Sequence, residues 1–101
     1  MSRRRLPARR KSLTFDLEHR SAGYSVCVGL YDDDRPGEIF LTGGRTGSDI
    51  DELLADLGVV LSRALQHGDT VDALAAGMGR LGDGRTPASI IGAVLDRTAS
   101  T

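Results

Sequence analysis

Apolar and polar residues alternate in three short stretches of the first half of the chain, over residues 13–17, 24–31 and 38–42. A period of two is typical of strands that bury one face. The intervening segments, residues 20–23 and 32–37, contain glycine or proline, and both residues favour tight turns. The pattern therefore predicts an antiparallel meander of three strands joined by short turns.

The spacing changes to that of a helix over residues 48–66. At 100° per residue, the apolar side chains fall within an arc of about 120°, which predicts one packed face. They are Ile50, Leu53, Leu54, Leu57, Leu61, Ala64 and Leu65. Ser48 stands three positions before Asp51 and is predicted to cap the start of this helix.

A second helix is predicted after Thr70, with an apolar stripe that includes Val71 and Leu81. Gly77 and Gly79 weaken it by about 1 kcal/mol each relative to alanine. No internal repeat links the predicted helical segments.

Thr86 and Pro87 are predicted to begin the third helix, as its cap and its first residue. The element order is thus βββααα, an α+β fold. Since each element has one apolar face, we expect the three helices to pack on one face of the meander. The opposite face would show Cys27, Tyr31 and Phe40, either as a contact patch for a homodimer or as scattered exposed residues.

The composition suits one small globular domain, which we place at residues 12–98. The chain has 101 residues, 40% apolar and 27% charged, with no Trp, so its core must be aliphatic. One cysteine excludes an internal disulfide. No apolar run reaches the ~18–20 residues of a membrane span, and no signal peptide is visible. We therefore expect a cytoplasmic protein that does not insert into membranes.

Charge is distributed unevenly along the chain. Residues 1–11 hold six positive charges and no acid, whereas the other 90 residues carry seven basic and fourteen acidic groups. The cations are Arg3, Arg4, Arg5, Arg9, Arg10 and Lys11. Such a segment is predicted to be a flexible arm. It could neutralise about six phosphates of a nucleic acid, with a salt slope near −5, or contact an acidic protein surface, including the chain's own body.

A glycine-rich loop before the first helix is a candidate anion site, because N–H groups at a helix start attract anions. Its residues are Gly43, Gly44, Arg45, Gly47 and Ser48. However, Asp49, Asp51 and Glu52 follow in the first helical turn and would repel a phosphate. A sharp strand-to-helix turn is the favoured interpretation.

The remaining reactive residues do not form a recognisable catalytic or metal-binding set. Residues 32–34 are three acids that lack the further donors of a calcium loop. His19 and His67 have no cysteine or second histidine nearby in sequence, and Cys27 has no evident base. We predict no catalytic residue, no metal and no cofactor.

Four segments give the chain a resemblance to a known family through their order and spacing. They are Arg35-Pro36-Gly37-Glu38-Ile39-Phe40, Gly43-Gly44-Arg45-Thr46-Gly47-Ser48, Ser62-Arg63-Ala64-Leu65-Gln66-His67-Gly68 and Pro87-Ala88-Ser89-Ile90-Ile91-Gly92-Ala93. Over about residues 3–96 the sequence resembles the TSCPD domain, which occurs at the C-terminus of cobalamin-dependent ribonucleotide reductases and as small separate proteins. The name-giving Thr-Ser-Cys-Pro-Asp motif has no counterpart here.

The resemblance implies a link to ribonucleotide reduction and DNA synthesis, but not the catalytic chemistry itself. That reaction needs a cysteine radical and a reducing dithiol pair, and this chain has one cysteine. Three hypotheses follow. The protein is an accessory module that binds nucleic acid, a nucleotide or the reductase; or it is a reductase component acting in trans; or it is a homodimeric interaction protein.

Overall fold

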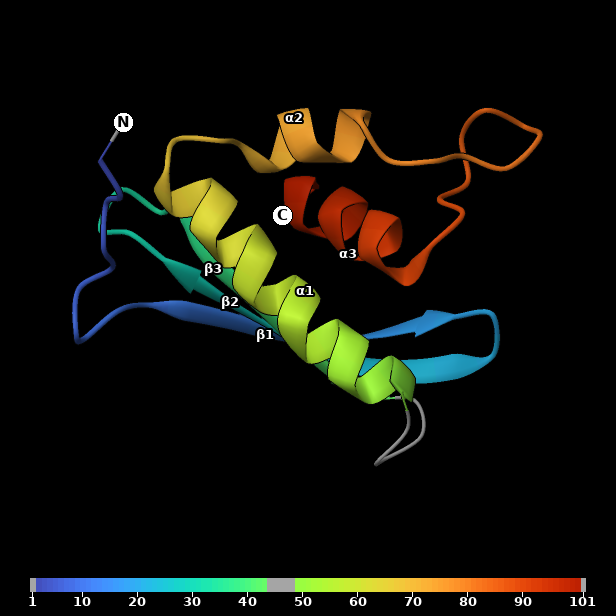
Figure 1. Cartoon of the computed structure of the whole chain (residues 1–101), viewed down its shortest axis with the longest axis horizontal. Coiled ribbons are helices and arrows are strands. Elements are labelled where there is room, and N and C mark those ends of the chain that lie inside the picture. Colours follow the sequence, from blue (N-terminus) through green and yellow to red (C-terminus); the bar gives the residue numbers. More distant parts are fainter. Residues whose placement is uncertain (1, 44–48, 101) are drawn as a thin grey trace. The chain divides into compact units, whose positions relative to one another are not determined.

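The computed structural model describes residues 2–43 and 49–100, which form two compact units, Met1–Gly68 and Asp69–Thr101 (Figure 1). The first contains the sheet and the longest helix, and the second contains two shorter helices. The α+β class and the order βββααα predicted from the sequence are confirmed. The packing of all three helices on one sheet face stays a prediction.

The sheet is an antiparallel meander in the order β1-β2-β3. Its strands are β1 (Ser12–His19), β2 (Ala22–Leu30) and β3 (Pro36–Gly43). Leu13, Val28 and Ile39 lie side by side across the three strands, as the predicted alternation requires. The turn between β1 and β2 is tighter than predicted, because His19 already pairs with Ala22.

Tyr31 lies just beyond the end of β2 and is buried. β2 ends at Leu30, and its pairing with β3 is irregular there, because Gly29 pairs with Glu38 but Leu30 pairs with Pro36. Tyr31 therefore does not continue the alternation of the strand; it is 1% exposed, with Arg4 against its ring and its hydroxyl. The prediction that Tyr31 belongs to an exposed patch with Cys27 and Phe40 was wrong for this reason, while Cys27 and Phe40 are exposed as expected.

Helix α1 (Asp49–Gln66) lies along the outer edge of β3 (Figure 1). The Ser62 hydroxyl accepts from the backbone N–H of Ile39 at 3.0 Å and donates to its carbonyl at 3.3 Å. The Gln66 side-chain amide donates to the carbonyl of Gly37 at 2.9 Å. These are backbone groups that an edge strand would otherwise leave unpaired, so α1 closes this edge of the sheet.

The buried face of α1 differs from the predicted one. Leu54, Leu61 and Leu65 are buried as expected, but Ile50 and Leu53 are more than half exposed. The helix turns a different side toward the sheet than the apolar arc predicts, because its contact face also includes polar and small positions. Gly58 is one of them, since a Cβ there would lie 3.1 Å from the Phe40 ring and 3.2 Å from the carbonyl oxygen of Ile39. The cap predicted at Ser48 lies outside the described residues.

The second unit holds α2 (Val71–Ala76) and α3 (Ile90–Ala99). Thr70 caps α2 as predicted, but the helix ends at Gly77, the first of the two glycines, and does not reach Leu81. The predicted start of α3 at Thr86 was wrong. Ser89 is its cap, with its hydroxyl accepting from the N–H of Gly92 at 3.1 Å.

Candidate functional site

The basic arm lies against the first unit in this structure. The N–H of Arg4 donates to the carbonyl of Gln66 at 2.7 Å, at the end of α1. The carbonyl of Lys11 accepts from the N–H of Leu30 at 2.9 Å, at the end of β2. Backbone bonds thus hold the arm at both of its ends. The flexibility of residues 1–11 in solution stays a prediction.

Tyr31 is the buried anchor of the arm. Its hydroxyl donates to the carbonyl of Arg4, and the Arg4 guanidinium lies 4.2 Å from the centre of its ring. Arg35 lies near the same ring at 5.6 Å. Two cations near one aromatic ring are each attracted to its negative face. Gly37 leaves room for the ring, since a Cβ there would approach it to 2.6 Å.

Most of the arm's cations have partners within the first unit. Arg10 pairs with Glu38 at 2.8 Å, and Lys11 pairs with Asp34 at 2.9 Å. The hydrogen bond from Lys11 to Asp34 raises the pKa of that amine. A longer contact of 4.0 Å joins Arg4 to Asp33. The arm therefore contacts the chain's own acidic turn, one of the three targets that the sequence left open.

Arg5 and Arg9 are two further residues of the arm that the sequence predicts to bind phosphate. Both are exposed, and neither forms an ion pair within residues 2–43 and 49–100. Arg3 donates to the side-chain carbonyl of Gln66 at 2.5 Å, which does not neutralise its charge. The charge available to a phosphate is thus smaller than the six cations of the sequence suggest.

Of the candidate anion loop, the structure describes Gly43 alone, and Gly44, Arg45, Gly47 and Ser48 lie outside the described residues. Gly43 has a φ of +140° and pairs with Tyr24. Beside it is a shallow depression whose lining includes the carboxylates of Asp16 and Glu18. These acids disfavour an anion there.

Lys11 of the arm and Gly43, the one described residue of the candidate anion loop, lie at opposite ends of β2. Gly43 pairs with Tyr24 near the start of the strand, whereas Lys11 bonds to Leu30 at its end.

Cys27 has no catalytic partner next to it in the sheet. It is exposed on the face opposite the apolar one, between Thr14 of β1 and Phe40 of β3. His19 is at the far end of β1, and His67 follows α1. Among the described residues, no three His, Cys, Asp or Glu side chains are grouped to hold a metal ion.

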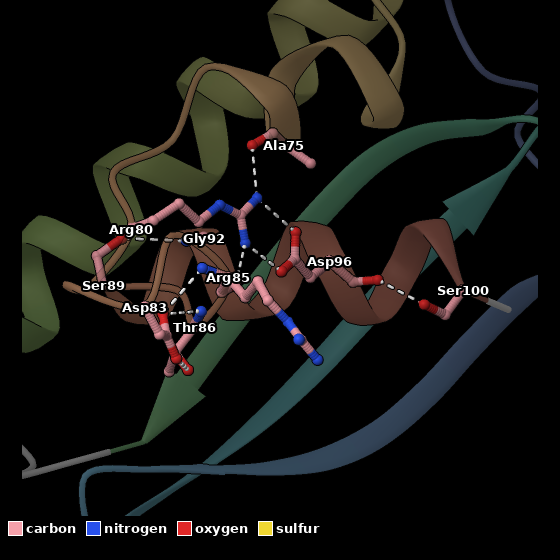
Figure 2. A network of polar contacts seen from close by, with 9 residues as sticks. All are labelled: Ala75, Arg80, Asp83, Arg85, Thr86, Ser89, Gly92, Asp96 and Ser100. Carbon is pink, nitrogen blue, oxygen red and sulfur yellow. Dashed lines mark hydrogen bonds and ion pairs between the residues drawn. The ribbon is translucent and has the colours of Figure 1, made fainter.

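A polar network in the second unit was not predicted from the sequence (Figure 2). Arg80 donates through both terminal nitrogens to the carboxylate of Asp96, and also to the carbonyls of Ala75 and Arg85. Its hydrogen bonds lower the pKa of Asp96. Arg80 thus links the end of α2, the following loop and α3. Arg80 and Asp96 are 16 residues apart. No helical or strand period links positions at that distance, so the sequence did not predict this ion pair.

Asp83 organises the loop between the two helices. Its carboxylate accepts from the hydroxyl and N–H of Thr86 and from the N–H of Arg85. These bonds lower its pKa to about 2. Thr86 is engaged here, which explains why it does not cap α3. These hydrogen bonds of Arg80 and of the Asp83 carboxylate all go to groups within the second unit, so we interpret both clusters as structural.

The described residues thus form a small α+β module of one antiparallel meander and three helices. The TSCPD domain family model matches residues 3–97, and the chain belongs to this family. A segment of the vitamin B12-dependent ribonucleotide reductase of Rhodopirellula baltica is 44% identical over 66 residues, which is 65% of this chain and 6% of that protein. No solved structure matches. None of the described helices is long and apolar enough to cross a bilayer.

Proposed function

We propose that this protein is a non-catalytic accessory module of ribonucleotide reduction that acts by binding the cobalamin-dependent reductase. The observation that carries the proposal is the 44% identity to a segment of such an enzyme. A domain inside a long chain packs against neighbouring parts of that chain. A chain with a similar sequence presents a similar surface, and can contact the same neighbours.

The chemistry of the chain supports an accessory role. Reduction of a ribonucleotide consumes two electrons, and a dithiol supplies them by closing a disulfide. This chain has one cysteine, so it cannot form that disulfide internally. The matched segment is also only 6% of the reductase's length, which leaves the reductase to supply the active site. A reducing cytoplasm suits an exposed, unpaired thiol and is the compartment we propose.

Binding is tested with two forms of the Rhodopirellula baltica reductase, the intact enzyme and one from which the similar segment has been deleted. The proposal predicts tighter binding of this chain to the truncated form, because the intact enzyme already fills the surface. Biolayer interferometry gives both affinities. Turnover of ribonucleotides by each form, with and without the chain, shows whether it acts as a component in trans. No binding to either form and no change in turnover would contradict the proposal.

A second candidate function is nucleic-acid binding through the arm. It is favoured by the exposed Arg5 and Arg9, which form no ion pair with a described residue, and by Arg35, which is exposed near the arm. Since Arg4, Arg10 and Lys11 already have acidic partners, we expect weak binding with a salt slope of about −2 to −3. Binding would be sequence-independent, because such contacts are made to phosphates.

Labelled single- and double-stranded DNA, titrated over a series of salt concentrations, tests this candidate. The double variant Arg5→Gln/Arg9→Gln should reduce the magnitude of the slope by about 1.8, for two lost phosphate contacts. Arg20→Gln is the matched control, because Arg20 lies in the β1–β2 turn, at the other end of β1 from the arm. Equal slopes for the two variants would exclude the arm as the contact. A titration with ribonucleotides in place of DNA tests the nucleotide alternative.

A further inference from the structure

The two outer edges of the sheet differ in the hydrogen bonding of their outward backbone groups. At the β3 edge, Ser62 and Gln66 of α1 bond to outward backbone groups. At the β1 edge, no strand within the described residues pairs with the outward side. The two edges of one sheet therefore offer a direct comparison.

The alternation of hydrogen bonds along β1 identifies its outward-facing backbone groups. Lys11 accepts from Leu30 across the β1–β2 pair. In an antiparallel pair, alternate residues bond inward and outward. The odd-numbered residues of β1 therefore face β2, and the outward N–H and C=O groups belong to Ser12, Thr14, Asp16 and Glu18. None of these groups bonds to another residue in the part of the chain that the structure describes.

The sequence of β1 carries little of the usual protection of an edge strand. Proteins block free edges with proline, charged side chains (above all lysine), a bulge or a very short strand. β1 has the acids Asp16 and Glu18, but it is eight residues long, contains neither proline nor lysine, and pairs with β2 without a register shift. Its side chains also alternate cleanly, with Leu13 on the apolar side still 39% exposed. Such a strand is suited to pair with another strand.

We propose that β1 pairs antiparallel with β1 of a second copy of this chain, which joins two meanders into one continuous six-stranded sheet. The proposal does not depend on the proposed function. It goes beyond the homodimer expected from sequence because it assigns the contact to the β1 edge and not to the Cys27 and Phe40 face.

Side-chain chemistry selects one register. The apolar residues of β1 must stay on the apolar face of both copies, so odd residues must oppose odd residues. With Phe15 opposite its own copy, Thr14 faces Asp16 of the second copy and Ser12 faces Glu18. Seven residues of each strand pair, giving about eight backbone hydrogen bonds. No like charges stand opposite each other.

The neighbouring registers are less favourable. Moving the centre to Asp16 places two carboxylates directly opposite each other, which is destabilising. Moving it to Thr14 reduces the paired stretch of β1 from seven residues to five, because the strand begins at Ser12. The register centred on Phe15 is therefore the one that the charges and the strand length favour together.

Sedimentation equilibrium of the full chain tests the proposal, with variants at Thr14. Thr14→Lys places a cation opposite Asp16 of the second copy at two symmetric positions and should tighten the dimer about 2- to 30-fold. Thr14→Asp should weaken it by a similar factor. Thr42→Asp is the matched control, since Thr42 is exposed on the same sheet face but belongs to β3. It should leave the dimerisation constant unchanged.

Thr14→Pro provides a second variant with a different mechanism. Because the N–H of Thr14 points outward, proline there removes a bond to the second copy but none to β2. We expect a monomer with a far-UV circular dichroism spectrum like that of the wild type. A wild type that stays monomeric at high micromolar concentration would overturn the proposal. So would a dimer that responds equally to Thr14→Lys and Thr14→Asp, or one that Phe40→Glu abolishes.

Discussion

Removing one buried hydroxyl should show how much the closure of the β3 edge contributes to stability. Ser62 is 5% exposed and makes two hydrogen bonds to Ile39, which is 0% exposed. Ser62→Ala leaves the buried N–H and C=O of Ile39 without their side-chain partner. An unsatisfied buried group costs about 1–3 kcal/mol, so we expect the free energy of unfolding to fall by about 2 kcal/mol. The melting temperature should fall by about 8–16 °C.

Tyrosine fluorescence during urea unfolding measures this loss in the first unit alone. The chain has two tyrosines, Tyr24 and Tyr31, and no Trp, and both lie in that unit. The urea midpoint should fall by about 1–2 M with an unchanged slope. Ser25→Ala is the control, because Ser25 is exposed and its bond to Asp16 is at the surface. Its effect should stay within about 0.5 kcal/mol. The same midpoint for both variants would refute the reasoning.

Three further predictions use other contacts of the two units. Gly58→Ala should lower the melting temperature although alanine favours helices, because its Cβ would press on the Phe40 ring and on β3; a rise would show that α1 can shift outward. Tyr31→Phe removes the hydroxyl that binds Arg4, so trypsin should cleave the arm faster than in the wild type, and equal rates would contradict arm docking. Asp83 has a pKa of about 2 in the folded chain, below that of an unfolded aspartate, so its carboxylate stabilises the loop above about pH 4 and loses this effect as the pH falls toward 2. The difference in melting temperature between wild type and Asp83→Asn, followed by circular dichroism, should shrink over that range; a constant difference would contradict this assignment.

Short-range patterns predicted the sheet well. The alternation of Leu13, Phe15 and Leu17 with polar residues gave the strand and its apolar side, and both are found. Alternation works because a strand's side chains point to opposite faces whatever surrounds it. The shift between Gly29 and Leu30 could not be foreseen, since it depends on how β2 pairs with β3.

Helix α1 shows why its packing was predicted only in part. The apolar arc predicts only part of the contact face. Ser62 and Gln66 are also buried, because they bond to a strand edge. Gly58, Ser62 and Gln66 recur at intervals of four, which places them on one side of the helix. That stripe of small and polar residues was the available signal. It would have suggested a second contact surface beside the apolar one.

The sequence predicted which charged residues belong to the candidate site, but not which of them pair with each other. The six cations of the arm were evident from the sequence, and so were the acids at 32–34. Their pairing requires the arm to fold back past Tyr31, which is buried just beyond the end of β2. A count of charges along a chain cannot show which of them neutralise each other in space.

The closure of one sheet edge by α1 also limits how far strand pairing can extend. A sheet with two open edges can add copies at both sides without end and grow into a fibre. Here the side chains of Ser62 and Gln66 already bond to the outward groups of Ile39 and Gly37 at the far side of the sheet. Pairing through β1 would therefore end at two chains, and a third chain would find no equivalent edge to join.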